Sequence, residues 1–269
     1  MDAALRRRTA RASFGLDKEA AVDIYARLQH AMQAKAEGKL LETLSIGLGY
    51  TCACTSDGGV GVAFTPRPDA AGCSVLDADE DYEGRAASES LALLGAGDPL
   101  HRAVGLAVAN ALNHAEAKDM PEDRDNSVLF DALKIGPGSR VAMVGCFTPL
   151  IRRLKERGAE LEVVDRGRGL GDEDAFKEKL GSWAQAVIMT STSIINNTLE
   201  ELLACVSGRT RVALLGPSTP LEPEAFAGLP VHVLAGTVPL DGEAALRAVR
   251  HAKGTPVIQR FSRKPCIML

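Results

Sequence analysis

The sequence predicts an α/β protein in which a smaller α+β domain precedes a doubly wound parallel sheet. From residue 140 onward, short runs of Val, Ile and Leu alternate with amphipathic segments, which is typical of parallel strands covered by helices. Earlier in the chain, residues 56–59 (Ser-Asp-Gly-Gly) join two β-like runs, a strong hairpin signal. A polar stretch with a proline, 116–125, separates the two patterns. We therefore predict domains at 1–116 and 117–269.

The first domain is predicted to contain two helices and the hairpin. Apolar residues at helical spacing predict a helix over 17–39, with Asp17 as its N-cap and Gly38 at its end. The β-like runs cover 43–54 and 60–65. Residues 100–114 are rich in Ala and Leu and predict a buried helix.

The second domain is predicted from the regular alternation of its elements. Strands are expected at 140–144, 160–164, 184–189, 211–215 and 231–234. Helices are expected at 128–135, 150–157, 173–180, 199–206, 222–226 and 242–253. This order is that of a Rossmann-like fold, which binds ligands outside the carboxyl ends of its strands.

Composition limits the classes of partner. The chain has 269 residues, 46% of them hydrophobic, so it can bury a substantial core. A net charge of −4 and only 4% aromatic residues argue against nucleic-acid binding. No apolar run approaches the roughly 18 residues needed to span a bilayer, so we expect no membrane partner and a cytoplasmic protein. The six cysteines, Cys52 and Cys54 among them, are expected to be reduced thiols. A homodimer is left open.

The stretch 186–220 organises the candidate site. It is predicted to form a strand, a helix and a second parallel strand, so the turns after both strands must lie at the same edge of the sheet. These turns are unusually rich in small polar residues. Capping boxes would explain only Thr198 and Thr219. Ligand contact is therefore predicted for Thr190, Asn196, Thr198, Gly216, Ser218 and Thr219. A helix N-terminus at this edge favours a carboxylate or phosphate, so a small anionic ligand is expected.

Further candidates follow the other strands. Gly145 and Gly236 would permit close approach to a ligand, and Asp165 stands where Rossmann folds place an acid on a ribose hydroxyl. The glycine fingerprint of a dinucleotide site is missing, because Phe147 and Pro149 occupy the first turn. Asp165 is therefore predicted as a hydrogen-bond acceptor for another ligand. No metal cage is predicted from the histidine spacing.

At these residues the chain resembles the putative heavy-metal chelation family. The segments that carry the resemblance are Arg140 to Gly145 with Pro149, Thr190 to Leu202, Gly216 to Leu221, Ala235 with Gly236, Tyr50 with Thr51, Gly61 to Thr65, and Gly105 to Ala111. The resemblance implies an enolase N-terminal-like domain followed by a Rossmann-like domain, with a ligand in the cleft between them. It also implies a part in handling heavy metals or their chelators, and makes Cys146 a weak candidate for soft-metal contact.

Three functions remain in competition at this point. The first is a binding protein or enzyme of metal-chelate metabolism, which holds a small anionic ligand, a heavy-metal ion or a metal chelate. The second is a nucleotide- or S-adenosylmethionine-dependent transferase that acts on a small chelator, with Asp165 on the ribose. The third is a non-catalytic assembly subunit. Whether any reaction is catalysed stays open.

Overall fold

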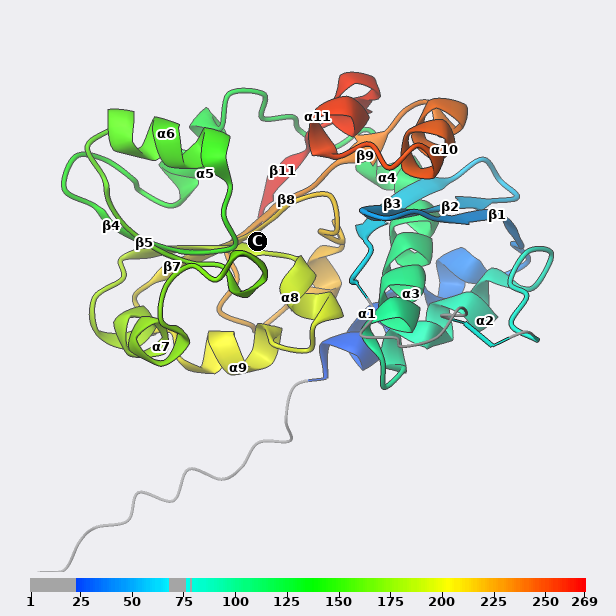
Figure 1. The fold of residues 1–269 in the computed structure, drawn as a ribbon, viewed down its shortest axis with the longest axis horizontal. Helices are drawn as coiled ribbons and strands as arrows, with labels where there is room; N and C mark the ends of the chain where they lie inside the picture. Colours follow the sequence, from blue (N-terminus) through cyan, green and yellow to red (C-terminus); the bar gives the residue numbers. More distant parts are fainter. Residues whose placement is uncertain (1–22, 68–75, 78) are drawn as a thin grey trace, which may run out of the picture.

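The two larger of the three sheets in the described residues lie side by side (Figure 1). The computed structural model describes residues 23–67, 76–77 and 79–269. The smaller sheet is antiparallel and consists of β1 (Leu41–Ile46), β2 (Tyr50–Thr55) and β3 (Val60–Phe64). The larger one has six strands, five of them parallel. The α/β fold class predicted from the sequence is therefore confirmed.

Helix α3 (Pro99–Leu112) packs on the smaller sheet, and α1 (Ile24–Ala36) and α2 (Ala87–Ala92) pack against α3. Helix α3 lies so close to β3 that a Cβ added to Gly61 would be 2.1 Å from the Ala107 carbonyl oxygen. Glycine is therefore needed at that position.

Two boundaries of the smaller unit differ from expectation. Asp23 caps α1 by accepting from the amides of Tyr25 and Ala26, whereas the predicted cap, Asp17, lies outside the described residues. The expected single run over 43–54 is wrong, because the chain turns at residues 47–49 (Gly-Leu-Gly) and makes two strands of it.

The larger sheet has the order β11-β8-β7-β6-β4-β5. Its parallel strands are β4 (Arg140–Val144), β5 (Glu160–Val164), β6 (Ala186–Thr190), β7 (Arg211–Leu215) and β8 (Val233–Ala235). Strand β11 (Cys266–Met268), which was not predicted, pairs antiparallel with β8. Because β4 lies between β5 and β6, the strand order reverses there. Such a switch point is where open α/β sheets bind their ligands.

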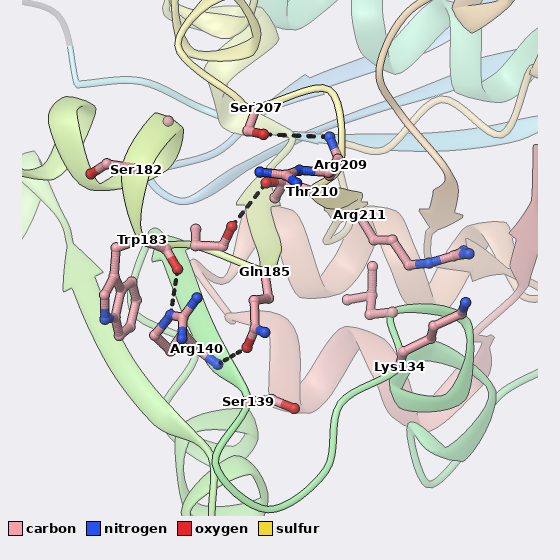
Figure 2. Close-up of a pocket in the computed structure, with 13 residues that line it drawn as sticks. Lys134, Ser139, Arg140, Ser182, Trp183, Gln185, Ser207, Arg209, Thr210 and Arg211 are labelled. Atoms are coloured by element: carbon pink, nitrogen blue, oxygen red, sulfur yellow. Dashed lines mark hydrogen bonds between the residues drawn. The ribbon is translucent and has the colours of Figure 1, made fainter.

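Both faces of this sheet are covered, as its alternating side chains require. Val141 and Met143 of β4 face α5 (Ser127–Ala132) and α6 (Thr148–Glu156), whereas Ala142 faces the opposite side. That side is covered by α7 (Glu173–Ser182) and α9 (Leu199–Ala204). Helices α5, α7 and α9 end at the amino-terminal edge of the strands, where Figure 2 shows basic side chains around a cavity.

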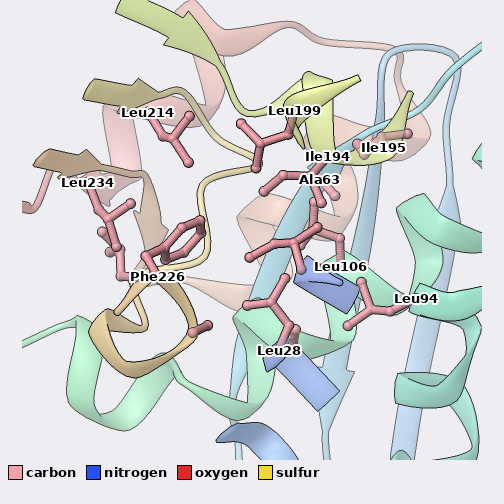
Figure 3. Close-up of a cluster of buried hydrophobic side chains, with 14 of the residues drawn as sticks. Leu28, Ala63, Leu94, Leu106, Ile194, Ile195, Leu199, Leu214, Phe226 and Leu234 are labelled. Atoms are coloured by element: carbon pink, nitrogen blue, oxygen red, sulfur yellow. The ribbon is translucent and has the colours of Figure 1, made fainter. Parts of the chain in front are cut away.

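The larger sheet and the smaller unit share one hydrophobic core. Leu28 of α1 and Leu106 of α3 belong to the same buried cluster as Leu199, Leu214 and Phe226 (Figure 3). The interface between the two units is therefore packed hydrocarbon over much of its area.

Helix α10 (Gly242–Arg250) follows the parallel strands in the sequence, but it packs against the smaller unit. Its residues Ala245, Leu246 and Val249 pack on Cys52, Val60 and Val62 of the smaller sheet. This packing joins a later segment of the chain to the smaller sheet, and the domain boundary after residue 116 stays a prediction.

The remaining elements are short. They are α4 (His114–Ala117), α8 (Thr192–Ile195), α11 (Thr255–Ile258), β9 (Val238–Pro239), β10 (Ser262–Arg263) and the 3-10 helices η1 (Leu93–Gly95), η2 (Arg166–Arg168), η3 (Pro223–Phe226) and η4 (Gln259–Phe261). Over the described ranges, no helix combines the length and apolarity needed to cross a membrane.

Candidate functional site

The turns after β4, β6 and β7 meet at the carboxyl edge of the sheet, as parallel topology predicts. Gly145 has φ +87°, and a Cβ added there would lie 3.0 Å from the Cβ of Thr190. Gly216 has φ +122°, and its added Cβ would lie 3.9 Å from Cε1 of Phe147. Both positions therefore favour glycine, and the ring of Phe147 lies beside both turns. The structure brings Gly145, Thr190 and Gly216 together at the carboxyl edge.

The N-terminus of α6 opens directly from the first of these turns. Its N-cap, Phe147, makes no side-chain cap, and its first turn contains no acidic residue. The partial positive charge of the helix end is therefore not offset within its own first turn. A helix N-terminus of this kind attracts carboxylates and phosphates.

Thr190 and Thr192 supply hydroxyl groups beside that helix end. Their Oγ1 atoms lie 3.0 Å apart, and both residues are half-buried. Ser193 donates to the Thr190 carbonyl at 2.8 Å, which folds the polar run into α8 instead of the expected open turn. Asn196 follows α8 and is exposed to solvent.

Asp165 holds the turns after β4 and β5 together. Its Oδ2 accepts from the Cys146 amide at 2.9 Å, and its Oδ1 accepts from the Arg168 amide at 3.2 Å. The Cys146 side chain is half-buried, with Sγ 3.9 Å from Oγ1 of Thr148. Asp165 thus already has two partners in its own turns, while Cys146 keeps some exposure.

Ser218, Thr219 and Gly236 lie beneath the surface, at the junction with the smaller unit. Oγ of Ser218 accepts from the Phe64 amide at 2.8 Å, and the Thr219 hydroxyl lies 2.8 Å from that of Ser191. Gly236 is packed so closely that an added Cβ would be 3.0 Å from the Leu221 side chain. The structure gives these residues intramolecular partners, in contrast to the exposed Asn196.

The predicted capping boxes are wrong. Thr198 occupies the N-cap position of α9 but makes no side-chain cap, and its hydroxyl donates to the Ser193 carbonyl at 3.5 Å. Glu201, the expected partner, pairs with Lys177 instead. Thr219 also caps no helix, because η3 begins only at Pro223.

A small cavity lies between the two units, at the place expected for a cleft. Its volume is about 10 Å³, and Thr219 and Asn113 contribute to its wall. That is room for about one water molecule. Within the part of the chain that the structure describes, no group of three or more His, Cys, Asp or Glu residues is placed to hold a metal ion.

A partly buried ion cluster that joins the units was not predicted. Nζ of Lys35 donates to Oδ1 of Asn113 at 2.6 Å, to Oε2 of Glu116 at 2.7 Å and to Oε2 of Glu222 at 2.9 Å. Burial lowers the pKa of Lys35, but its bonds to the two glutamates outweigh this, so the pKa is raised. Because Glu222 follows the turn at 216–221, the cluster fixes that turn. Lys35 is 78 or more positions from each of its three partners, beyond the reach of any sequence motif.

His101 of α3 forms a second ion cluster. Its Nδ1 contacts Oδ2 of Asp98, and its Nε2 lies 2.7 Å from Oε1 of Glu80. Burial lowers the pKa of His101, yet the hydrogen bonds to these two carboxylates raise it above its ordinary value.

The thiols predicted to be reduced are free at all five described positions. Cys52 is fully buried and Cys54 half-buried on β2. Contact with the Cys54 thiol, together with burial, raises the pKa of Cys52, whereas the same contact lowers the pKa of Cys54.

Comparison with known proteins gives two family matches. The model DUF364, described as "Putative heavy-metal chelation", matches residues 128–268, and DUF4213, with the same description, matches residues 29–113.

Two crystal structures of DUF364 proteins of unknown function resemble the chain. The one from Pyrococcus horikoshii has a TM-score of 0.76 at 22% identity and covers 92% of this chain and 100% of that one. The one from Desulfitobacterium hafniense DCB-2 has a TM-score of 0.74 at 22% identity, with 93% and 99% covered. At this identity the likeness shows the fold.

An uncharacterized protein of Methanocaldococcus jannaschii is 26% identical over 172 residues, which cover 62% of this chain and 66% of that protein. The match thus spans just under two thirds of that relative.

Proposed function

Since the chain belongs to the DUF364 family, described as "Putative heavy-metal chelation", we propose that it binds a small anionic ligand of the kind that chelates heavy metals. The ligand occupies the carboxyl edge of the parallel sheet, over the turns that contain Gly145, Thr190 and Gly216. The observation that carries the proposal is the convergence of these three turns at the switch point, beside the uncapped N-terminus of α6.

The chemistry of the site suits a carboxylate-rich chelator. The free helix end attracts negative charge, and the hydroxyls of Thr190 and Thr192 donate to oxygen atoms. The two glycines permit the ligand to approach the backbone closely. Cys146 provides a soft thiol near the same turn, as the heavy metals of a chelate require. Asp165 keeps Cys146 in place through its amide.

The remaining predicted residues take supporting roles in this proposal. Ser218 and Thr219 fix the turn after β7 through their contacts with Phe64 and Ser191. Thr198 and Gly236 shape the surrounding backbone, while exposed Asn196 is free to donate to the ligand from the rim. The cytoplasm is the expected compartment, since the five described cysteines are free thiols.

Calorimetric titration with citrate, alone and as its Ni²⁺ and Cu²⁺ complexes, tests the proposal. A Thr190→Val and Thr192→Val double variant should bind at least about tenfold more weakly, because each hydrogen bond to a charged group contributes about 1.5–3 kcal/mol. Thr43→Val, which removes a hydroxyl from the smaller sheet, serves as the matched control and should bind normally. Equal affinity of the double variant and the control would exclude the site.

A separate variant tests the metal. Cys146→Ser should weaken binding of the copper complex more than binding of citrate alone, because a thiolate is the softer ligand. The transferase alternative enters the same experiment as an adenine-cofactor arm. Stabilisation by an adenine cofactor that is lost in Asp165→Asn, without any response to citrate or its complexes, would favour the transferase.

A further inference from the structure

A larger cavity lies at the opposite edge of the parallel sheet. Its volume is about 530 Å³, and its wall is formed where β4, β6 and β7 begin and where α5, α7 and α9 end (Figure 2). Cavities that bind small molecules range over about 300–1,000 Å³. This cavity is thus large enough for a nucleotide. It lies at the amino-terminal edge of the strands, away from the ligand site proposed at the carboxyl edge.

The cavity is strongly basic. Lys134, Arg140, Arg209 and Arg211 line it, and no Asp or Glu does. This concentration of positive charge stands out in a chain whose net charge is −4. Among residues with described positions, no carboxylate forms an ion pair with any of the four.

Two of these arginines are anchored by the ends of helices. Nε of Arg140 donates to the carbonyl of Trp183 at 2.7 Å, and Nη1 of Arg211 donates to the carbonyl of Ala132 at 3.1 Å. Cations commonly offset the negative ends of helices in this way. Each of these bonds uses one of the five guanidinium donors, so both arginines keep donors for a further partner.

Offsetting the negative end of a helix does not account for Lys134 and Arg209. Over the described ranges, the side-chain nitrogens of these two residues form no hydrogen bond or ion pair. Lys134 also has φ +54°, a left-handed conformation that favours glycine. The backbone thus gives no reason for a lysine here, whereas its charge adds to that of the cavity.

We propose that this cavity is a second binding site, which takes a small organic diphosphate of the nucleoside diphosphate class. Four cations match the charge of a diphosphate, and arginine binds phosphate through two parallel hydrogen bonds. Trp183 belongs to the wall and is half-buried, and in this proposal its indole ring stacks on the base. Charge and aromatic surface together distinguish this ligand from the metal chelate of the carboxyl edge.

The chain contains a single tryptophan, so its fluorescence reports on this cavity alone. The full chain is titrated with ADP, inorganic pyrophosphate and citrate. We expect a saturable change with both diphosphates, tighter binding of ADP, and weaker binding of all at high salt, because salt screens the cations. Absence of a saturable response to diphosphates would overturn the proposal, and citrate binding as tightly as ADP would overturn the ligand class.

Variants identify the residues that bind. Lys134→Gly and Arg209→Gln should each weaken ADP binding about tenfold or more, since each removes a charged donor. Lys253→Gln, on the exposed connection after α10, is the control and should bind as the wild type does. Lys134→Gly removes an unfavourable backbone conformation, so it should fold, as circular dichroism can show. Unchanged ADP affinity in both cavity variants would refute the assignment.

This experiment is independent of the proposed function. The Thr190→Val and Thr192→Val double variant should lose citrate binding measured by calorimetry and still bind ADP in the fluorescence titration. Loss of ADP binding in that double variant would place the diphosphate at the carboxyl edge and overturn the second site.

Discussion

Removing the ammonium group of Lys35 should destabilise the protein, because it leaves the carboxylate of Glu222 buried without its partner. In Lys35→Met, Glu222 would keep a charge on a side chain that is only 9% exposed. Breaking a buried ion pair costs about 3–5 kcal/mol. Because Lys35 itself is 21% exposed, solvent screening reduces this to about 2–3 kcal/mol.

Two smaller contributions add to this loss of stability. Glu116 is 62% exposed, so its pair with Lys35 contributes at most about 1 kcal/mol. The lost donor to Asn113 costs about 1 kcal/mol. The free energy of unfolding should therefore fall by about 3–5 kcal/mol, which lowers Tm by roughly 10 °C in a chain of this size.

Urea denaturation followed by circular dichroism measures the effect. Lys253→Met is the control and should stay within about 0.5 kcal/mol of the wild type, as exposed substitutions do. Adding Glu222→Gln to Lys35→Met should recover part of the loss, since an unpaired amide costs less to bury than an unpaired charge. A loss below about 1 kcal/mol in Lys35→Met, or no recovery in the double variant, would refute the reasoning.

Three further predictions concern single groups. The pKa of His101 is raised from 6.5 in the folded state, so its stabilisation, under about 1 kcal/mol, is complete below pH 6.5 and is lost as the pH rises through the folded pKa. Urea midpoints of the wild type and His101→Gln should therefore converge as the pH rises above 6.5 and through the folded pKa of His101. Iodoacetamide at pH 8, followed by mass spectrometry, should label Cys54 and Cys146 well before Cys52, since only the thiolate reacts; faster labelling of Cys52 would contradict its burial. Lys134→Gly should raise the stability by about 1 kcal/mol in thermal melts, by relieving the positive φ.

The parallel strands could be predicted closely because their sequence pattern has a direct physical cause. Strands buried on both faces must be continuous apolar runs, and β4 and β7 are found at the expected residues. Strand β11 could not be predicted in this way. It has only three residues, and its pairing with β8 depends on where the tertiary fold places them.

The candidate site likewise has one part that the sequence could predict and another that it could not. Parallel topology alone requires Gly145, Thr190 and Gly216 to meet at one edge, and they do. The partner of Ser218, the Phe64 amide, is 154 positions away, so no local pattern could reveal it. The basic cavity was missed because its four cations are dispersed over residues 134–211 and gather only in the folded chain.

Because helix α10 packs on the smaller sheet, the strands of that sheet contact a segment that lies far from them in the sequence. The Arg250 guanidinium donates to the Ser45 hydroxyl across 205 positions. On the ribosome, the outer face of that sheet must therefore stay uncovered until the chain has been made past residue 250. The antiparallel unit should mature long after its own strands have been made, and a nascent chain stalled before residue 240 should be sensitive to proteases there.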